Sequence, residues 1–243
     1  MKKHLEAHFL LWENLTDIVR LLEIHARTAG TGPGRKYNVE VLNRSAIVLL
    51  VACWESFVED LAAVSFQLLI DHADKPSVFP QKVLTLAAKD LRSDQDARKV
   101  WALAGDGWRS VLKKHKEAIF DRYIGRMNTP RPGQVDNLYQ NLMGVPAVSK
   151  AWSWGRTSAR RATQKLDELV NLRGAIAHRV SAGRPVHKQT VIEYTDFVNR
   201  IAVKTSNHIR DFIFARISEA PWGVFAYRSP FKAVQKEGPA DKK

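Results

Sequence analysis

Apolar residues recur at intervals of three and four in every long segment of this chain, and almost no stretch alternates with period two. The first spacing marks one face of an α-helix, whereas alternation with period two would indicate a β-strand. Because the β signal is nearly absent, we expect an all-α fold. Of the 243 residues, 45% are apolar, which is enough to build a sizeable helical core.

Glycine and proline divide the chain into expected helices. The first covers residues 4–27 and ends before the Gly/Pro run at 30–34. The second covers residues 39–72 and is apolar around most of its circumference in the middle, which places it at the centre of a bundle. Further helical segments are expected over residues 81–104, 108–127, 135–143, 159–180 and 188–218.

The segments between these helices, and the lack of an internal repeat, indicate the domain organisation. Residues 145–154 are expected to be irregular, and Thr157 or Ser158 is expected to cap the helix that follows. No repeat divides the chain, so we expect one domain over residues 1–220. Residues 221–243 then form a C-terminal extension that is partly disordered.

Charge and cysteine content narrow the functional classes. The 38 Lys and Arg residues exceed the 25 Asp and Glu residues by 13, so an anionic partner such as nucleic acid is expected. The single cysteine, Cys53, excludes an intrachain disulfide and any CxxC metal motif, which fits a reducing, cytoplasmic location. The longest apolar run, residues 46–54, is too short to cross a bilayer, and the charged N-terminus does not read as a secretory signal.

Most motifs of known chemistry are missing from the sequence. It contains no phosphate loop, dinucleotide fingerprint, HExxH pair or nucleophile elbow. The eight histidines are scattered; His4 and His8 are four residues apart, but we expect them to be solvated at the N-terminus. We therefore expect neither a metal site nor a cofactor.

The basic excess peaks in residues 145–190, which hold nine basic and two acidic residues. Such a stretch is either a solvated face or a surface that contacts nucleic acid phosphates. The candidate phosphate contacts are Lys150, Arg156, Arg160, Arg161 and Lys165.

Four tryptophans lie among or beside basic residues. In that setting a tryptophan can stack on a base, although it more often fills a core. These residues are Trp101, Trp108, Trp152 and Trp154.

Arg173 and His178 lie five residues apart near the end of the expected helix 159–180. Histidine can move protons at neutral pH, and arginine can hold phosphate oxygens with a permanent charge, so the pair could support attack of an RNA 2′-hydroxyl on the adjacent phosphate. Five helical residues turn through about 140°. The two side chains can therefore converge only through the long Arg173 stem, a helix distorted near Gly174, or a second copy of the motif. A helix-terminal histidine that merely contacts the last carbonyls is the alternative.

Glu55 lies in the most apolar of the expected helices, and its helical neighbours are apolar. A carboxylate that is even partly buried needs a partner, and we expect Arg173 to be that partner. The alternatives are a structural salt bridge to another basic residue, and Glu59 as the functional carboxylate of the same helix.

Two segments together resemble the HEPN superfamily (higher eukaryotes and prokaryotes nucleotide-binding). Residues 46–61, AIVLLVACWESFVEDL, give an apolar run followed by Glu, an aromatic residue and an acidic-Leu pair. Residues 169–178, LVNLRGAIAH, give Arg, four residues and His on the penultimate long helix. The chain is most similar to the RiboL-PSP-HEPN type, and the two segments frame residues 40–215.

This resemblance implies an HEPN-like helical bundle that acts as a metal-independent endoribonuclease. Its catalytic pair would be Arg173 and His178. From its expected burial and pairing, we expect Glu55 to orient this pair. It further implies a homodimer with two motifs at its interface, RNA as substrate, and a toxin or phage-defence role in which an antitoxin or another protein is a further partner.

One position departs from the family pattern. The family usually has Asn, Asp or His directly after the arginine, and this chain has Gly174. A catalytically inactive HEPN-type module that binds RNA, a nucleotide or a protein therefore stands as the alternative function. A DNA-binding protein is less favoured, because the sequence contains no recognition-helix motif.

Overall fold

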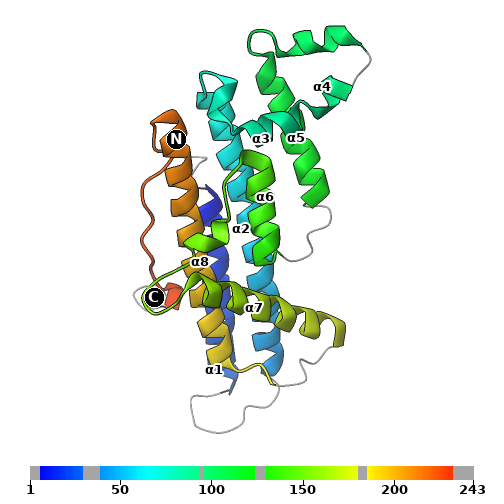
Figure 1. Ribbon diagram of the computed structural model, residues 1–243. Helices are drawn as coiled ribbons and strands as arrows, with labels where there is room; N and C mark the ends of the chain where they lie inside the picture. The colour runs from blue at the N-terminus through cyan, green and yellow to red at the C-terminus, as the bar shows by residue number, and fades with distance from the viewer. Residues whose placement is uncertain (1–5, 30–38, 94–95, 124–129, 180–184, 232–243) are drawn as a thin grey trace, which may run out of the picture.

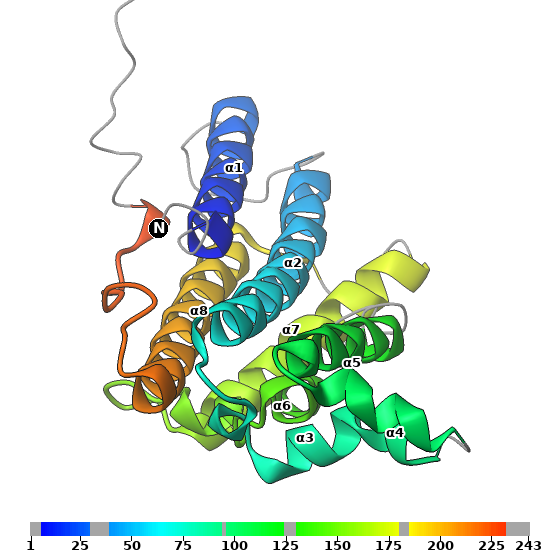
Figure 2. The ribbon, with the colours of Figure 1, turned by 90° about the horizontal axis from the view of Figure 1, so that it is seen from above.

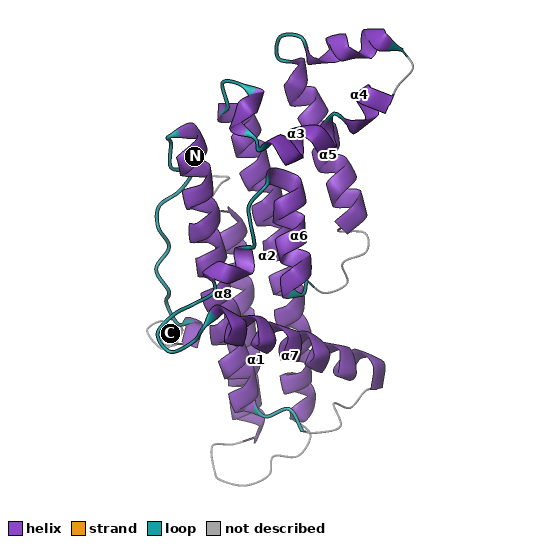
Figure 3. Cartoon of the chain, in the orientation of Figure 1, coloured by secondary structure: helices purple, strands orange, loops and turns teal. Residues whose placement is uncertain are grey.

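The computed structural model describes residues 6–29, 39–93, 96–123, 130–179 and 185–231. Within these ranges the chain forms eight α-helices, three short 3₁₀ helices and no strand (Figures 1 and 3). The expected all-α fold is therefore confirmed. None of the described helices is long and apolar enough to span a membrane.

Three long helices form the body of the molecule: α1 (Glu6–Ala29), α2 (Glu40–His72) and α8 (Lys188–Ile217). They lie side by side in both views (Figures 1 and 2). Trp54 and Phe57 of α2 are buried next to one another, as the long apolar run predicts. Because α2 is apolar on nearly every side, it packs against α1, α6, α7 and α8 and holds the centre of the bundle.

Two further helices position the candidate site. α6 (Pro132–Met143) starts with a proline in its first turn, three residues earlier than expected, and ends at Gly144, whose φ of 80° suits glycine. α7 (Ala159–Arg179) crosses α2 at a steep angle (Figure 1). The Ser158 hydroxyl accepts a hydrogen bond from the backbone N–H of Arg161 at 3.3 Å, which confirms the expected cap.

The segment expected to be helical over residues 81–104 forms three short helices instead. They are α3 (Gln81–Ala87), α4 (Lys89–Ser93) and the 3₁₀ helix η3 (Ala97–Leu103). Asp96 caps η3 through the backbone N–H of Arg98, a side-chain contact that starts a new helix within the expected one. With α5 (Gly107–Tyr123), these elements project at one end of the bundle (Figure 1).

Two smaller elements complete the fold. The 3₁₀ helix η2 (Pro76–Val78) follows α2, and η5 (Val148–Ala151) lies in the interval that was expected to be irregular. Residues 221–231, the C-terminal strap, run back along α8 (Figure 1). Residues 232–243, which include the tail expected to be disordered, lie outside the described residues.

Candidate functional site

Glu55 of α2 and Arg173 of α7 come together where the two helices cross. Both side chains are half-buried. Burial raises the pKa of Glu55, and the positive charge of Arg173 lowers it by a smaller amount. The two side chains form no direct ion pair, although the structure describes both, so Arg173 acts on Glu55 through space.

Glu59 lies one helical turn beyond Glu55 and is also half-buried. Burial and the charges of Glu55 and Asp60 raise the pKa of Glu59 to about 6. Two acidic side chains therefore lie one turn apart on α2, and Glu55 is within electrostatic range of the guanidinium of Arg173. This arrangement suits the binding of a cationic side chain, and Arg173 supplies one.

His178 lies in the last turn of α7, but its side chain is outside the described part of the structure. The helix runs unbroken through Gly174, so the register keeps residues 173 and 178 about 140° apart. Distortion near Gly174 is thereby excluded as the route to convergence. The long Arg173 stem and a second copy of the motif are the routes that stay open.

Arg131, which sequence reasoning did not single out, ties α7 to the rest of the site. Its guanidinium donates to Oδ1 of Asp167 at 3.0 Å and to Oδ1 of Asn171 at 2.7 Å, both on α7. The carbonyl of the preceding residue, Pro130, accepts a hydrogen bond from Nε1 of Trp54, the neighbour of Glu55, at 3.1 Å. Residues 130 and 131, just before α6, thus connect α2 to α7 and form the Arg131 clamp. The bonded residues are 36 to 76 positions apart, so no local sequence pattern predicts these contacts.

A family model described as RiboL-PSP-HEPN matches residues 13–211, which covers most of the chain and both helices of the site. The chain belongs to this family. No curated protein and no solved structure matches the chain. Membership confirms the family resemblance, and it indicates an RNA-related role, because HEPN domains typically bind RNA and often form dimers.

The basic residues of this HEPN domain gather around the start of α7. The side chains of Lys150, Arg156, Arg160 and Arg161 are exposed. The ammonium of Lys165 is half-buried instead, 5.4 Å from the ring centres of Tyr194 and Phe197 on α8. Arg160 precedes Arg173 by 13 residues, which is about 20 Å along the helix. These cations therefore flank the crossing of α2 and α7 rather than belonging to it.

The four tryptophans next to basic residues differ in their burial in the HEPN fold. Trp108 and Trp152 are buried in the core, so the suggestion that they stack on bases is wrong. Trp154 packs on Phe197 beneath the guanidinium of Arg200. Trp101 is 77% exposed and is the tryptophan most open to a base.

Metal-ligating side chains are dispersed in the described ranges. Nowhere in them do three His, Cys, Asp or Glu residues form a group that could hold a metal ion.

Proposed function

We propose that this HEPN protein is a metal-independent endoribonuclease whose nucleophile is the 2′-hydroxyl of its RNA substrate. The observation that carries the proposal is the crossing of α2 and α7, where Glu55 lies within electrostatic range of Arg173, on the helix that also contains His178. In this proposal Arg173 holds the scissile phosphate, His178 moves protons, and Glu55 orients Arg173.

The proposed reaction needs only these groups. His178 takes the proton of the 2′-hydroxyl, and the 2′-oxygen forms a bond to phosphorus. Arg173 stabilises the added negative charge of the pentacoordinate phosphate. The bond from phosphorus to the 5′-oxygen then breaks, and that oxygen receives the proton that His178 took up. The products are a 2′,3′-cyclic phosphate and a 5′-hydroxyl end.

The environment of Arg173 supports its role. Arg173 makes no hydrogen bond or ion pair to another described residue, and it lies within electrostatic range of Glu55. Its N–H donors are thus available to a phosphate, while the carboxylate favours a guanidinium at this position. Glu55 acts as a positioning residue, because its interaction with the substrate passes through Arg173.

Arg173 and His178 lie about 140° apart around one α7, so a second copy of the pair would help to complete the site. A homodimer would supply that second copy. Beside Arg173 the protein has an open apolar groove of about 520 Å³. Its lining is mainly apolar, with Val41, Val48 and Ala52 of α2 and Ile176, one turn beyond Arg173, and it also includes Arg44 and Ser45. Val41 is 52% exposed. Exposed apolar surface next to the motif supports a two-fold interface that places two copies of Arg173 close together.

A matched pair of valine substitutions tests the dimer. Val41→Glu introduces a charge into the groove, and Val100→Glu introduces the same charge at an equally exposed valine of η3, remote from the motif. Light scattering should show a dimer for the wild type and Val100→Glu and a monomer for Val41→Glu, with cleavage lost in the monomer. Cleavage by a monomeric wild type at micromolar concentration would contradict the two-motif site.

A second pair of variants separates the catalytic cation from the basic surface. Changing Arg160 and Arg161 together to Gln should lower the slope of log affinity against log salt by up to about 1.5, with bound RNA still cleaved. Arg173→Ala should reduce cleavage far more than affinity. If Arg173→Ala only weakens binding and bound RNA is cut as fast as before, Arg173 is simply part of the basic surface.

The alternative function is an HEPN module that binds RNA, a nucleotide or a protein without cleaving it. The observation that favours it is Gly174, which leaves no side chain directly after Arg173. If the protein binds RNA but cleaves none of the RNAs tested, this alternative is established.

The biological setting follows from the proposed activity. An endoribonuclease of this kind would act in the cytoplasm as a toxin or phage-defence effector, and a toxin would need an antitoxin as its protein partner. Expression of the wild type should arrest growth of a bacterial host, whereas the His178→Ala protein should not. Equal growth with both proteins, at equal amounts of folded protein, would contradict a toxin role that depends on cleavage.

A further inference from the structure

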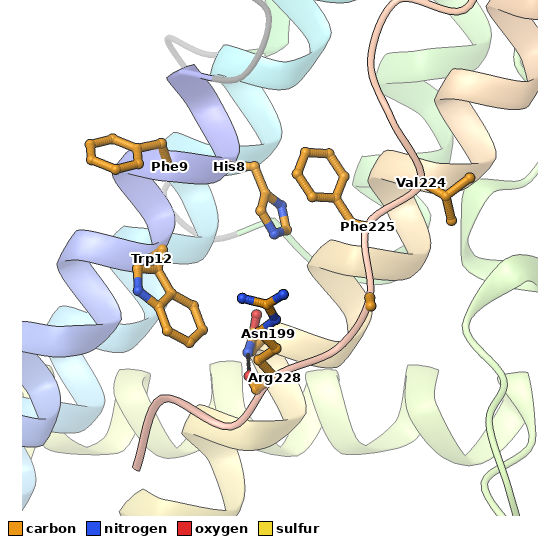
Figure 4. A pocket seen from close by; sticks show the side chains of 8 residues that line it. His8, Phe9, Trp12, Asn199, Val224, Phe225 and Arg228 are labelled. Atoms are coloured by element: carbon orange, nitrogen blue, oxygen red, sulfur yellow. Dashed lines mark hydrogen bonds between the residues drawn. The ribbon is translucent and has the colours of Figure 1, made fainter. Parts of the chain in front are cut away.

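A pocket of about 530 Å³ lies away from the crossing of α2 and α7, between α1, α8 and the C-terminal strap (Figure 4). Its size is in the range of pockets that bind small organic ligands. One wall is Trp12 of α1, and the opposite wall includes Phe225 of the strap (Figure 4).

The wall formed by Phe225 is a pair of stacked rings. The imidazole of His8 stacks on Phe225 with ring centres 4.0 Å apart and planes 25° apart. Burial lowers the pKa of His8 to about 4, so its ring is neutral at pH 7. The expectation that His8 is solvated is therefore wrong, because the strap covers it; His4 lies outside the described residues.

One cation, Arg228, lines this mainly apolar pocket, together with the polar side chains of His8 and Asn199. In Figure 4 the guanidinium of Arg228 extends from the strap toward the space between Trp12 and Phe225. Arg228 forms no ion pair with any other described residue, and its side chain is exposed. Its backbone is held in place, since Asn199 of α8 donates to the Arg228 carbonyl at 2.7 Å. The pocket thus offers aromatic surfaces and one available positive charge on a backbone that is held in place.

The rim of the pocket is apolar and open to solvent. Phe9 is 58% exposed on the α1 side, and Val224 is 70% exposed on the strap side. Exposed aromatic and apolar side chains on both sides of a cavity are typical of a binding surface. A planar ring that carries a negative charge would match the walls and the cation together.

Separate cations lead from this pocket to the basic start of α7, and the carboxylate of Asp196 lies beside them, where it accepts a hydrogen bond from the Tyr227 hydroxyl at 2.8 Å. The guanidinium of Arg200 lies 3.5 Å from the ring centre of Tyr227, the neighbour of Arg228. The same guanidinium lies 5.9 Å from the ring of Trp154, which precedes the exposed Arg156 by two residues. A polyanion bound along α7 can therefore continue over Arg200 to Arg228.

We infer that the pocket between α1, α8 and the C-terminal strap binds one nucleotide of an RNA strand, with the base against Trp12 and the His8–Phe225 pair and the phosphate on Arg228. A nucleotide unites a flat aromatic ring with a negative charge, and the separate cations lead to the pocket from the basic surface. This inference rests on the RNA-binding part of the proposed function. It adds a recognition subsite outside the cleavage site.

The test uses a fluorescein-labelled RNA decamer with 2′-O-methyl groups, which cannot be cut by 2′-hydroxyl attack. Its affinity is measured by fluorescence anisotropy for the full chain and three variants. Trp12→Leu keeps a smaller apolar side chain but removes the stacking surface, and Arg228→Gln removes the cation from an exposed position. Arg92→Gln is the charge-matched control, because it lies on α4 at the far end of the molecule (Figure 1).

The expected results follow from the two contacts. Trp12→Leu should weaken binding by about 5- to 150-fold. Arg228→Gln should lower the slope of log affinity against log salt by about 0.7, and should weaken binding more than Arg92→Gln does. Circular dichroism checks that each variant is folded; if Trp12→Leu is not, Arg228→Gln against Arg92→Gln decides the question.

Three outcomes would overturn the inference. The first is a wild type that does not bind the decamer, and the second is Arg228→Gln binding no more weakly than Arg92→Gln. The third is a change in oligomeric state with unchanged affinity in Trp12→Leu, which would assign the pocket to a protein contact. Cleavage of unmodified RNA is measured separately, so an intact pocket without cleavage would overturn only the proposed nuclease.

Discussion

Gly174 offers a substitution whose effect on stability can be worked out from the structure. It lies within α7, and it is not one of the described glycines with a positive φ. A Cβ built there meets no atom within 4 Å. Glycine in a helix interior costs about 0.8–1 kcal/mol relative to alanine. Gly174→Ala should therefore stabilise the protein by about 1 kcal/mol, which raises Tm by roughly 2–4 °C in a chain of this size.

The assay is urea unfolding followed by circular dichroism at 222 nm, with Gly107→Ala as the control. A Cβ at Gly107 would clash with the backbone carbonyl of Ala102, so that variant should lose stability. If Gly174→Ala is destabilised as well, α7 is not a regular, open helix at the motif and the geometry argued for Arg173 is wrong.

The same position also tests the chemistry. Gly174→Asn restores a residue type that the family usually carries after the arginine, and the open space accommodates it. We expect this variant to fold and to cleave RNA faster than the wild type, whereas Gly174→Ala should change stability alone. Equal cleavage by all three proteins would show that this position has no part in the reaction.

The remaining predictions concern stability and reactivity. Because the pKa of Glu59 is raised to about 6 in the folded state, its contribution to stability is complete below pH 4.5 and is lost as the pH rises through 6. After a discount for solvent screening, Glu59→Gln should be more stable than the wild type by up to about 1 kcal/mol at pH 7, and this difference in urea unfolding should disappear well below pH 4.5. Burial raises the pKa of Cys53 to about 11, so a disulfide reagent should label it only after unfolding; rapid labelling of the native protein would contradict its burial. Tyr139→Phe removes a buried hydrogen bond of 3.0 Å to the Val58 carbonyl and should cost about 1 kcal/mol in the same unfolding assay.

The sequence predicted the long helices well, because their apolar periodicity is a local property. The observed bounds of α2 and α8 differ from the expected ones by one residue at most. The segment over residues 81–104 was less predictable, because side-chain caps such as Asp96 divide it without changing its composition. The path of the C-terminal strap depends on contacts with α8 that no local pattern encodes.

The candidate site, too, was predicted from the sequence only in part. Glu55 and Arg173 were expected to be partners because a carboxylate in an apolar helix needs a cation, and the structure places them within electrostatic range. The Arg131 clamp and the pocket at His8 could not be found from the sequence, since each joins residues far apart in the chain. The roles of Arg173, His178 and the basic residues stay predictions that experiments on the protein must test.

The most direct test of the proposed cleavage mechanism compares RNA and DNA of the same sequence, incubated with the purified protein in excess EDTA. The wild type should cleave the RNA, leave the DNA intact, and produce ends with cyclic or 3′-phosphate, because the nucleophile is the 2′-hydroxyl. The His178→Ala protein should fold and leave both intact. Cleavage of the DNA, dependence on added metal, or RNA cleavage by His178→Ala at the wild-type rate would contradict the proposed mechanism.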